Sequence, residues 1–124
     1  MTYFDVPLQV AGVPAREFVE VQALVDTGAV HSLLPGQVLR RLGIEPVERV
    51  RAQVADGRVI EMDIGEARLR LDGRERTVVV LFGADNARPL LGATTLEMFN
   101  LSVDLVHQRL VPVDVLPLMA GSLP

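Results

Sequence analysis

The residue best placed to do chemistry is Asp26, which ends an apolar run and begins the tetrapeptide Asp26-Thr27-Gly28-Ala29. A carboxylate at the end of a buried strand is costly to leave charged and alone, so it needs hydrogen-bond donors or a partner that shares its proton. Such a carboxylate can act as a general acid or base. The alternative is that Asp26 only shapes a turn, with its side chain bonded to the main chain two residues on.

Most other chemistries lack the residues that they need. The sequence has no cysteine, and its two histidines, His31 and His107, show none of the ligand spacings of zinc proteins. The serines lack the G-x-S-x-G pattern of a nucleophile elbow, and there is no glycine-rich phosphate loop. We therefore expect no metal and no cofactor, and carboxylate chemistry is the class that remains.

The composition suits one soluble domain of 124 residues. The net charge of -4 argues against a nucleic-acid-binding protein, which would normally carry a basic face. The N-terminus lacks the pattern of a signal peptide, and no apolar run approaches the roughly 18 residues that span a bilayer. We therefore expect a cytoplasmic protein that binds neither nucleic acid nor membrane.

Short apolar runs separated by turn signals dominate the chain, and the scarcity of aromatics leaves a strand-favouring set of valine, leucine and isoleucine. Two Asp-Gly pairs, at 56–57 and 72–73, predict hairpins in which both central residues have positive φ. Pro35 and Gly43 bracket one short helix, and Thr94 has the residue type of an N-cap for another. The expected strands span residues 4–10, 17–25, 49–55, 58–64, 66–71, 76–82, 101–105 and 109–115, and the expected helices span 37–42 and 94–99. This pattern predicts a mostly antiparallel β-domain, closed or sandwich-like.

The surroundings of Asp26 resemble a known family. The segment from Ala23 to Pro35 resembles the active-site strand and loop of retropepsin-like aspartic proteases, and the bacterial single-domain members look most similar. Leu90-Leu91-Gly92-Ala93, two apolar residues and a glycine that open a short helix, matches a second hallmark of that family. The order and spacing of these motifs agree with the family over residues 20–105.

The resemblance implies a mostly β fold, a closed antiparallel β-barrel of the retropepsin type with one or two short helices. A single domain is expected over residues 1–118, with a flexible tail over 119–124. By analogy with the family, Tyr3, Phe4 and the strand near 111–115 are expected at a dimer interface. His31 could line the cleft, although a surface or packed position is commoner for histidine.

The activity that the resemblance implies is that of an aspartic endopeptidase, in which two facing carboxylates share one proton and activate a water. The sequence contains one Asp-Thr-Gly and no Asp-Ser-Gly. The second acid must therefore be Asp26 of another copy of the chain. We expect a homodimer whose two-fold axis passes between the two Asp26 side chains, with a peptide or protein substrate as the other partner.

The resemblance also assigns roles around the acid. Thr27, Gly28 and Ala29 would support the active-site loop, with the Thr27 hydroxyl bonding across the dimer axis and Gly28 leaving room for the substrate main chain. Leu91 and Gly92 would lie behind this loop.

The flap that covers the substrate would be the hairpin tip Ala55-Asp56-Gly57-Arg58. Retroviral flaps are richer in glycine, whereas this tip has one glycine and two charges. This difference favours an alternative function, a dimeric peptide-binding module with the same fold and little or no catalysis. A third possibility is an ordinary β-domain in which Asp-Thr-Gly occurs by chance, against which the match at residues 90–93 argues.

Overall fold

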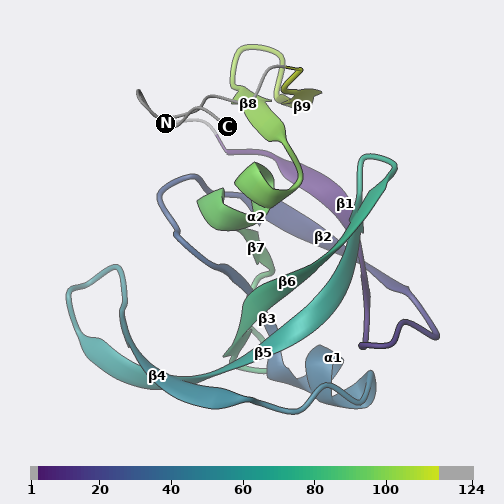
Figure 1. The fold of residues 1–124 in the computed structure, drawn as a ribbon. Helices are drawn as coiled ribbons and strands as arrows, with labels where there is room; N and C mark the ends of the chain where they lie inside the picture. Colours follow the sequence, from purple (N-terminus) through teal and green to yellow (C-terminus); the bar gives the residue numbers. More distant parts are fainter. Residues whose placement is uncertain (1–2, 115–124) are drawn as a thin grey trace, which may run out of the picture.

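The chain folds into a mostly β structure with two short helices (Figure 1). The structure is a computed structural model and describes residues 3–114. The expected tail over 119–124 lies outside the described residues, and the single domain over 1–118 stays a prediction. The strands are β1 (Asp5–Ala11), β2 (Val19–Val25), β3 (Ser32–Pro35), β4 (Glu48–Gln53), β5 (Val59–Leu71), β6 (Arg74–Gly83), β7 (Leu90–Leu91), β8 (Leu101–Asp104) and β9 (Arg109–Pro112), and the helices are α1 (Gly36–Arg41) and α2 (Ala93–Met98).

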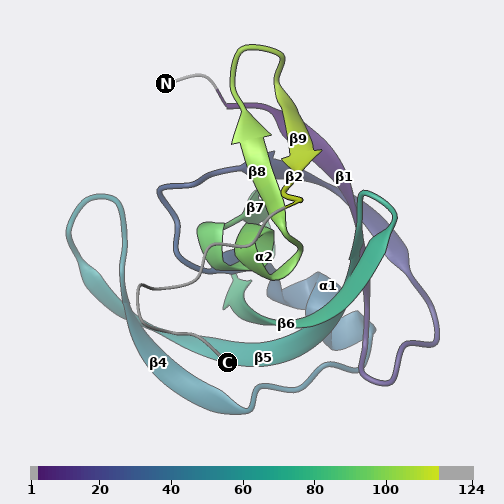
Figure 2. The ribbon, with the colours of Figure 1, turned by 45° about the horizontal axis from the view of Figure 1, so that its top comes forward.

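Seven strands form one sheet in the order β1-β2-β7-β3-β6-β5-β4, while β8 and β9 form a separate hairpin. An additional pairing of β1 with β5 links six of these strands into a ring, and β4 extends outward from β5 (Figures 1 and 2). The β2–β7 and β3–β6 pairs are parallel, so the sheet is mixed rather than entirely antiparallel. Each parallel pair includes a short strand, β3 or β7, that the sequence pattern does not predict. A strand of two to four residues is too short to show an alternation of apolar and polar residues.

β5 runs without interruption through Gly65, where the sequence predicts a break between two strands. Gly65 is buried, and a Cβ added to it would lie 2.9 Å from the ring of Phe82 and 3.2 Å from the carbonyl oxygen of Glu45. The glycine therefore permits close packing inside a continuous strand instead of ending the strand.

The two Asp-Gly hairpins differ in their turns. Between β5 and β6 the turn consists of Asp72 (φ 52°) and Gly73 (φ 76°), and both φ angles are positive as predicted. Between β4 and β5 the loop is longer, and Gly57 (φ 89°) has positive φ whereas Asp56 does not, so that prediction is wrong for Asp56. The Asp56 carboxylate instead accepts the main-chain N–H of Arg58 at 3.0 Å, which stabilises a different local turn.

Both helices lie within one or two residues of their predicted positions. Pro35 immediately precedes α1, and Gly43 (φ 80°) follows its C-terminal end in the left-handed conformation common there. The N-cap of α2 is Gly92 and not Thr94, so the predicted cap is wrong. The helix begins earlier because the Gly92 carbonyl accepts the N–H of Leu96 at 3.3 Å.

The hydrophobic core joins the ring strands to both helices and to β8, and its members are mostly aliphatic. Burying one such side chain contributes roughly 2 kcal/mol, so this core fixes the relative positions of β2, β3 and β7. The completely buried aliphatic residues in these strands and helices include Leu8, Val10, Ala23, Leu34, Leu39, Leu69, Val80 and Leu91.

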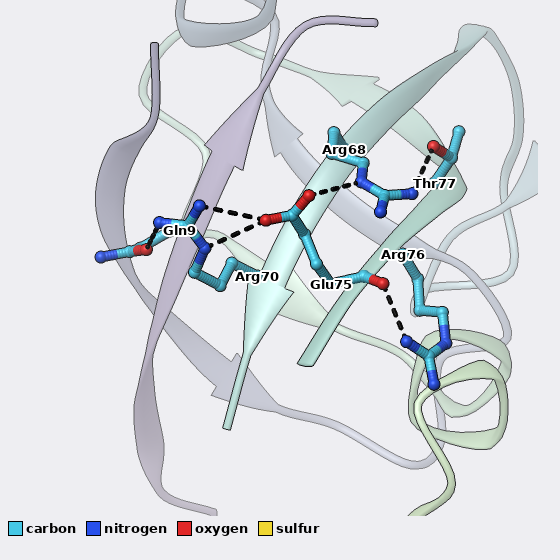
Figure 3. Close-up of polar contacts among 6 residues, drawn as sticks. All are labelled: Gln9, Arg68, Arg70, Glu75, Arg76 and Thr77. Atoms are coloured by element: carbon cyan, nitrogen blue, oxygen red, sulfur yellow. Dashed lines mark hydrogen bonds and ion pairs between the residues drawn. The ribbon is translucent and has the colours of Figure 1, made fainter. Parts of the chain in front are cut away.

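A polar network covers the outer face where β1, β5 and β6 meet (Figure 3). Glu75 accepts hydrogen bonds from Arg68 at 2.9 Å and from Arg70 at 3.0 Å, and these bonds lower the pKa of Glu75. Arg70 also donates to the side chain of Gln9 at 3.0 Å. Since Gln9 and Arg70 are register partners, the network reinforces the β1–β5 pairing that completes the ring.

Candidate active site

Asp26 lies directly after the last residue of β2, at the point where β2 runs beside β7. Leu24 and Val25 pair in parallel with Leu90 and Leu91. The ladder continues one step further, because the main-chain N–H of Asp26 donates to the carbonyl oxygen of Leu91 at 3.0 Å. The strand core thus fixes the backbone of Asp26, while its side chain is half-buried at the edge of that core.

The chain turns immediately after Asp26. The carbonyl oxygen of Asp26 accepts the N–H of Ala29 at 3.1 Å, and its side-chain oxygen Oδ1 accepts the N–H of Gly28 at 3.0 Å. Asp26 therefore does shape the turn, and it uses one of its two side-chain oxygens, Oδ1, to do so. A carboxylate has a second oxygen that can accept further donors or share a proton, so the turn and an acid-base role are compatible.

The segment from Gly92 to Thr94 lies against the loop that follows Asp26. Ala93 and Thr94 donate their main-chain N–H groups to the carbonyl oxygens of Ala29 (2.8 Å) and Val30 (3.0 Å). The start of α2 thus holds the loop through main-chain bonds, which need no particular side chain on either partner.

Two polar side chains lie beneath this loop, and the sequence assigns neither of them a role. Ser32 and Thr95 are 0% and 2% exposed, and their hydroxyl oxygens are 2.6 Å apart. Ser32 also accepts the N–H of Gly92 at 3.0 Å. The signal that could have found them is weak, because a serine that begins an apolar run and a threonine in a short helix are both common.

The outer surface of the loop is open to solvent. Thr27 and Gly28 are exposed, and Val30 is 65% exposed although it is apolar. His31 is half-buried, which does not distinguish a cleft-lining position from a surface or packed one. The structure thus brings the Asp26 loop and residues 91–92 together and leaves the solvent-facing side of that loop uncovered within the described chain.

The β4–β5 hairpin, which carries the expected flap, is held by contacts within itself. Gly57 donates its N–H to the carbonyl of Val54 at 2.9 Å, and Gln53 donates to the carbonyl of Gly57 at 3.3 Å. Arg58 binds Asp56 through its Nε at 2.7 Å. The pKa of Asp56 is lowered mainly by the hydrogen bond from the main-chain N–H of Arg58 and next by the bond from the Arg58 side chain.

The hairpin tip and the Asp26 loop project to the same side of the molecule in both views (Figures 1 and 2). Within residues 3–114, no hydrogen bond joins the tip, including Ala55, to that loop. The assignment of this tip as a flap therefore stays a prediction, because the tip makes no hydrogen-bond contact with Asp26 in the described chain.

Neither a metal cluster nor a membrane-spanning helix occurs in the described part of the chain. Its residues include no group of three or more histidine, cysteine, aspartate or glutamate side chains that could hold a metal ion. None of its helices is long and apolar enough to cross a membrane.

Residues 16–98 match the model of a protein family described as "gag-polyprotein putative aspartyl protease". The matched range includes the Asp26 loop, the β4–β5 hairpin and Gly92. A comparison with curated proteins finds no match.

Several solved structures share the fold. EIAV protease complexed with the inhibitor HBY-793 is 19% identical with a TM-score of 0.60, over 79% of this chain and 88% of that chain. The retroviral protease-like domain of Ddi1 from Leishmania major is 22% identical with a TM-score of 0.59, over 99% of each chain. A retropepsin-like aspartic protease from Rickettsia conorii is 18% identical with a TM-score of 0.55, over 83% of this chain and 86% of that chain. At these identities the similarity shows the fold, and it includes a bacterial protein of the type that the sequence resembles.

Proposed function

We propose, because this chain belongs to the gag-polyprotein aspartyl protease family, that it is an aspartic endopeptidase whose catalytic residue is Asp26. The observation that carries the proposal is the setting of this acid. Asp26 follows β2 directly, is bonded to Leu91 through its main-chain N–H, and is half-buried in a turn where its Oδ1 accepts the Gly28 N–H. A backbone held by hydrogen bonds, with a carboxylate that keeps one oxygen for further partners, suits acid-base catalysis.

The reaction needs two carboxylates, and this chain supplies one Asp-Thr-Gly. We therefore propose a homodimer in which the two Asp26 side chains face each other across a two-fold axis. The exposure of Thr27 and Gly28 in one chain is consistent with a second chain or a substrate covering them. In this arrangement Thr27 bonds across the axis, and Gly28 leaves room for the substrate main chain.

In the proposed reaction, the two carboxylates hold one proton between them. The ionised Asp26 takes a proton from a water molecule while the water oxygen attacks the carbonyl carbon of the scissile amide. The protonated Asp26 of the other chain gives its proton to the carbonyl oxygen, which forms a tetrahedral intermediate. As this intermediate collapses, the Asp26 that took the water proton gives a proton to the amide nitrogen, and the other Asp26 takes a proton from a hydroxyl group of the intermediate. The C–N bond breaks, and one proton is again held between the two carboxylates.

The substrate that suits this site is an extended peptide, which would lie as a strand between the Asp26 loops and the β4–β5 hairpins. Closure of the hairpin over the substrate would exclude water from the reacting atoms. The residues proposed to contact substrate from the hairpin are Ala55, Asp56, Gly57 and Arg58.

A second candidate function is a dimeric peptide-binding module with little or no catalysis. The observation that favours it is the hairpin tip, where Arg58 and Asp56 form an ion pair with each other at 2.7 Å. Groups engaged in this way in the free chain must rearrange before they contact a substrate, which would weaken closure.

The experiment compares wild-type protein with Asp26→Asn on a diverse peptide library at several values between about pH 4 and pH 7, because the apparent pKa values of a carboxylate pair belong to the pair and the activity must be sought over a range. Cleavage by the wild type alone supports the peptidase. Equal cleavage by both proteins indicates a contaminant and removes the support. Binding of peptides without cleavage, at concentrations where the protein is dimeric, supports the binding module instead.

A further inference from the structure

One peptide unit, the bond between Leu91 and Gly92, is hydrogen-bonded to both ends of the loop that carries Asp26. Its carbonyl oxygen accepts the N–H of Asp26 at 3.0 Å, and its N–H donates to the hydroxyl of Ser32 at 3.0 Å. A peptide unit is planar and stiff, so its carbonyl and N–H cannot rotate independently. The bond to Ser32 therefore sets the orientation of the carbonyl that holds Asp26.

Thr95 in turn fixes the hydroxyl of Ser32. The two hydroxyl oxygens are 2.6 Å apart, and either can be the donor. Both side chains are almost completely buried, and they are the buried polar side chains of the described chain. Since a serine hydroxyl otherwise rotates freely, the contact with Thr95 selects the rotamer that receives the Gly92 N–H. The contact is uncharged and so adds no charge near the Asp26 carboxylate.

We propose that Ser32 and Thr95 are positioning residues for Asp26, acting through the Leu91–Gly92 peptide; this role rests on the peptidase function proposed above. The two-fold axis makes the effect large. A displacement of Asp26 in one chain is repeated in the other, so the separation of the two carboxylates changes by up to twice that displacement. Misplacing catalytic groups by about 1 Å can cost on the order of 100-fold in rate.

The test measures kcat and KM for peptide cleavage by Thr95→Val and Thr95→Ser. Valine keeps the shape of threonine but removes the hydroxyl, so kcat should fall about 10- to 100-fold while KM changes little. Serine keeps the hydroxyl and should restore most of kcat. Leu69→Ala, in the core of β5, is the control for lost stability, and its folded fraction should keep the wild-type kcat. An unchanged kcat in Thr95→Val, or an equal loss in Thr95→Ser, overturns the proposal.

A second measurement uses the wild-type chain alone, so it depends neither on catalysis nor on whether a variant folds. Amide hydrogen exchange of the wild-type chain should show the N–H groups of Asp26 and Gly92 protected to a similar extent, because they belong to one hydrogen-bonded unit. Exchange of the Asp26 N–H at the rate of exposed loop amides, with Gly92 still protected, overturns the positioning role. If the wild type cleaves nothing but this shared protection is present, the peptidase proposal fails while the connection between Ser32, Gly92 and Asp26 stands.

Discussion

Gly92 lies so close to His31 that a Cβ added to residue 92 would be 2.6 Å from both the carbonyl carbon and the carbonyl oxygen of His31. The same Cβ would be 2.9 Å from the carbonyl oxygen of Ala29. These are main-chain atoms, so a rotamer change cannot relieve the contact. The close approach lets the start of α2 bond directly to the loop that follows Asp26.

Gly92→Ala should therefore displace the Asp26 loop. We expect a loss of about 1–3 kcal/mol in the free energy of unfolding, typical of overpacking, and a larger loss of peptide cleavage than this stability change explains. Denaturant unfolding and cleavage rates per folded molecule would be measured together. Gly43→Ala is the control, because position 43 has open space and positive φ, so it should lose stability and keep its cleavage rate. Full activity in Gly92→Ala would contradict the role given to this contact.

Thr27→Ala should weaken the dimer. The proposed hydroxyl bond across the axis occurs twice by symmetry, so its loss should cost about 1–3 kcal/mol and raise the dimer dissociation constant roughly tenfold or more. Specific cleavage activity, measured over a range of protein concentrations, should reach its plateau at higher concentration. Thr27→Ser retains the hydroxyl and should behave as wild type. If both variants associate like the wild type, Thr27 does not act across the axis.

The parts of the molecule that could be predicted from the sequence are those whose cause is local. Asp26 is marked by its immediate neighbours, and Asp72-Gly73 predicts its turn because two adjacent residues supply both positive φ angles. The strands β3 and β7 depend instead on neighbours far along the chain. A glycine such as Gly65 can either end a strand or permit close packing within one. Here it permits close packing, because the Phe82 ring lies 2.9 Å from where a Cβ on residue 65 would be.

The same distinction applies to the site. The role proposed for the Asp26 carboxylate comes from its motif, but the hydroxyl pair of Ser32 and Thr95 joins residues 63 positions apart in the chain. Neither residue type at its position indicates burial or a shared hydrogen bond. Only the fold brings Thr95 beneath the Asp26 loop, so a single sequence cannot reveal it.

Gly57→Ala tests whether the β4–β5 hairpin acts as a flap. Gly57 has φ 89°, and a Cβ added there would meet open space, so alanine should add backbone strain of about 1–2 kcal/mol without a clash. Gly73→Ala is a matched control, with φ 76° and open space in the other hairpin. Both should lose similar stability in thermal unfolding. A flap predicts a higher KM in Gly57→Ala alone, whereas equal kinetics in the two variants would argue against this function.

Asp104→Asn tests the turn between β8 and β9. Hydrogen bonds from the side chain and main chain of His107, with a further bond from Arg109, lower the pKa of Asp104 from 3.8 to about 2. The folded chain thus keeps this carboxylate ionised where the unfolded chain takes up a proton. Its contribution to stability is present above about pH 4 and is lost as the pH falls towards 2.

Denaturant midpoints measured from about pH 2 to pH 7 should therefore fall more steeply with acid for the wild type than for Asp104→Asn in the window between pH 4 and pH 2. Asp85→Asn, which removes a carboxylate from an exposed loop, should retain the wild-type slope. Parallel curves for wild type and Asp104→Asn would show that the hydrogen bonds at Asp104 do not contribute to stability.

The central claim, that one catalytic site contains Asp26 from two chains, is tested most directly by mixing subunits. Wild-type protein at a fixed concentration that is fully dimeric is incubated with Asp26→Asn until subunits have exchanged, and peptide cleavage is then measured. Random pairing predicts that an equal amount of Asp26→Asn lowers the rate to about one half and a threefold excess lowers it to about one quarter. A rate that does not change with added Asp26→Asn, or cleavage by Asp26→Asn alone at the wild-type rate, would contradict the two-chain site.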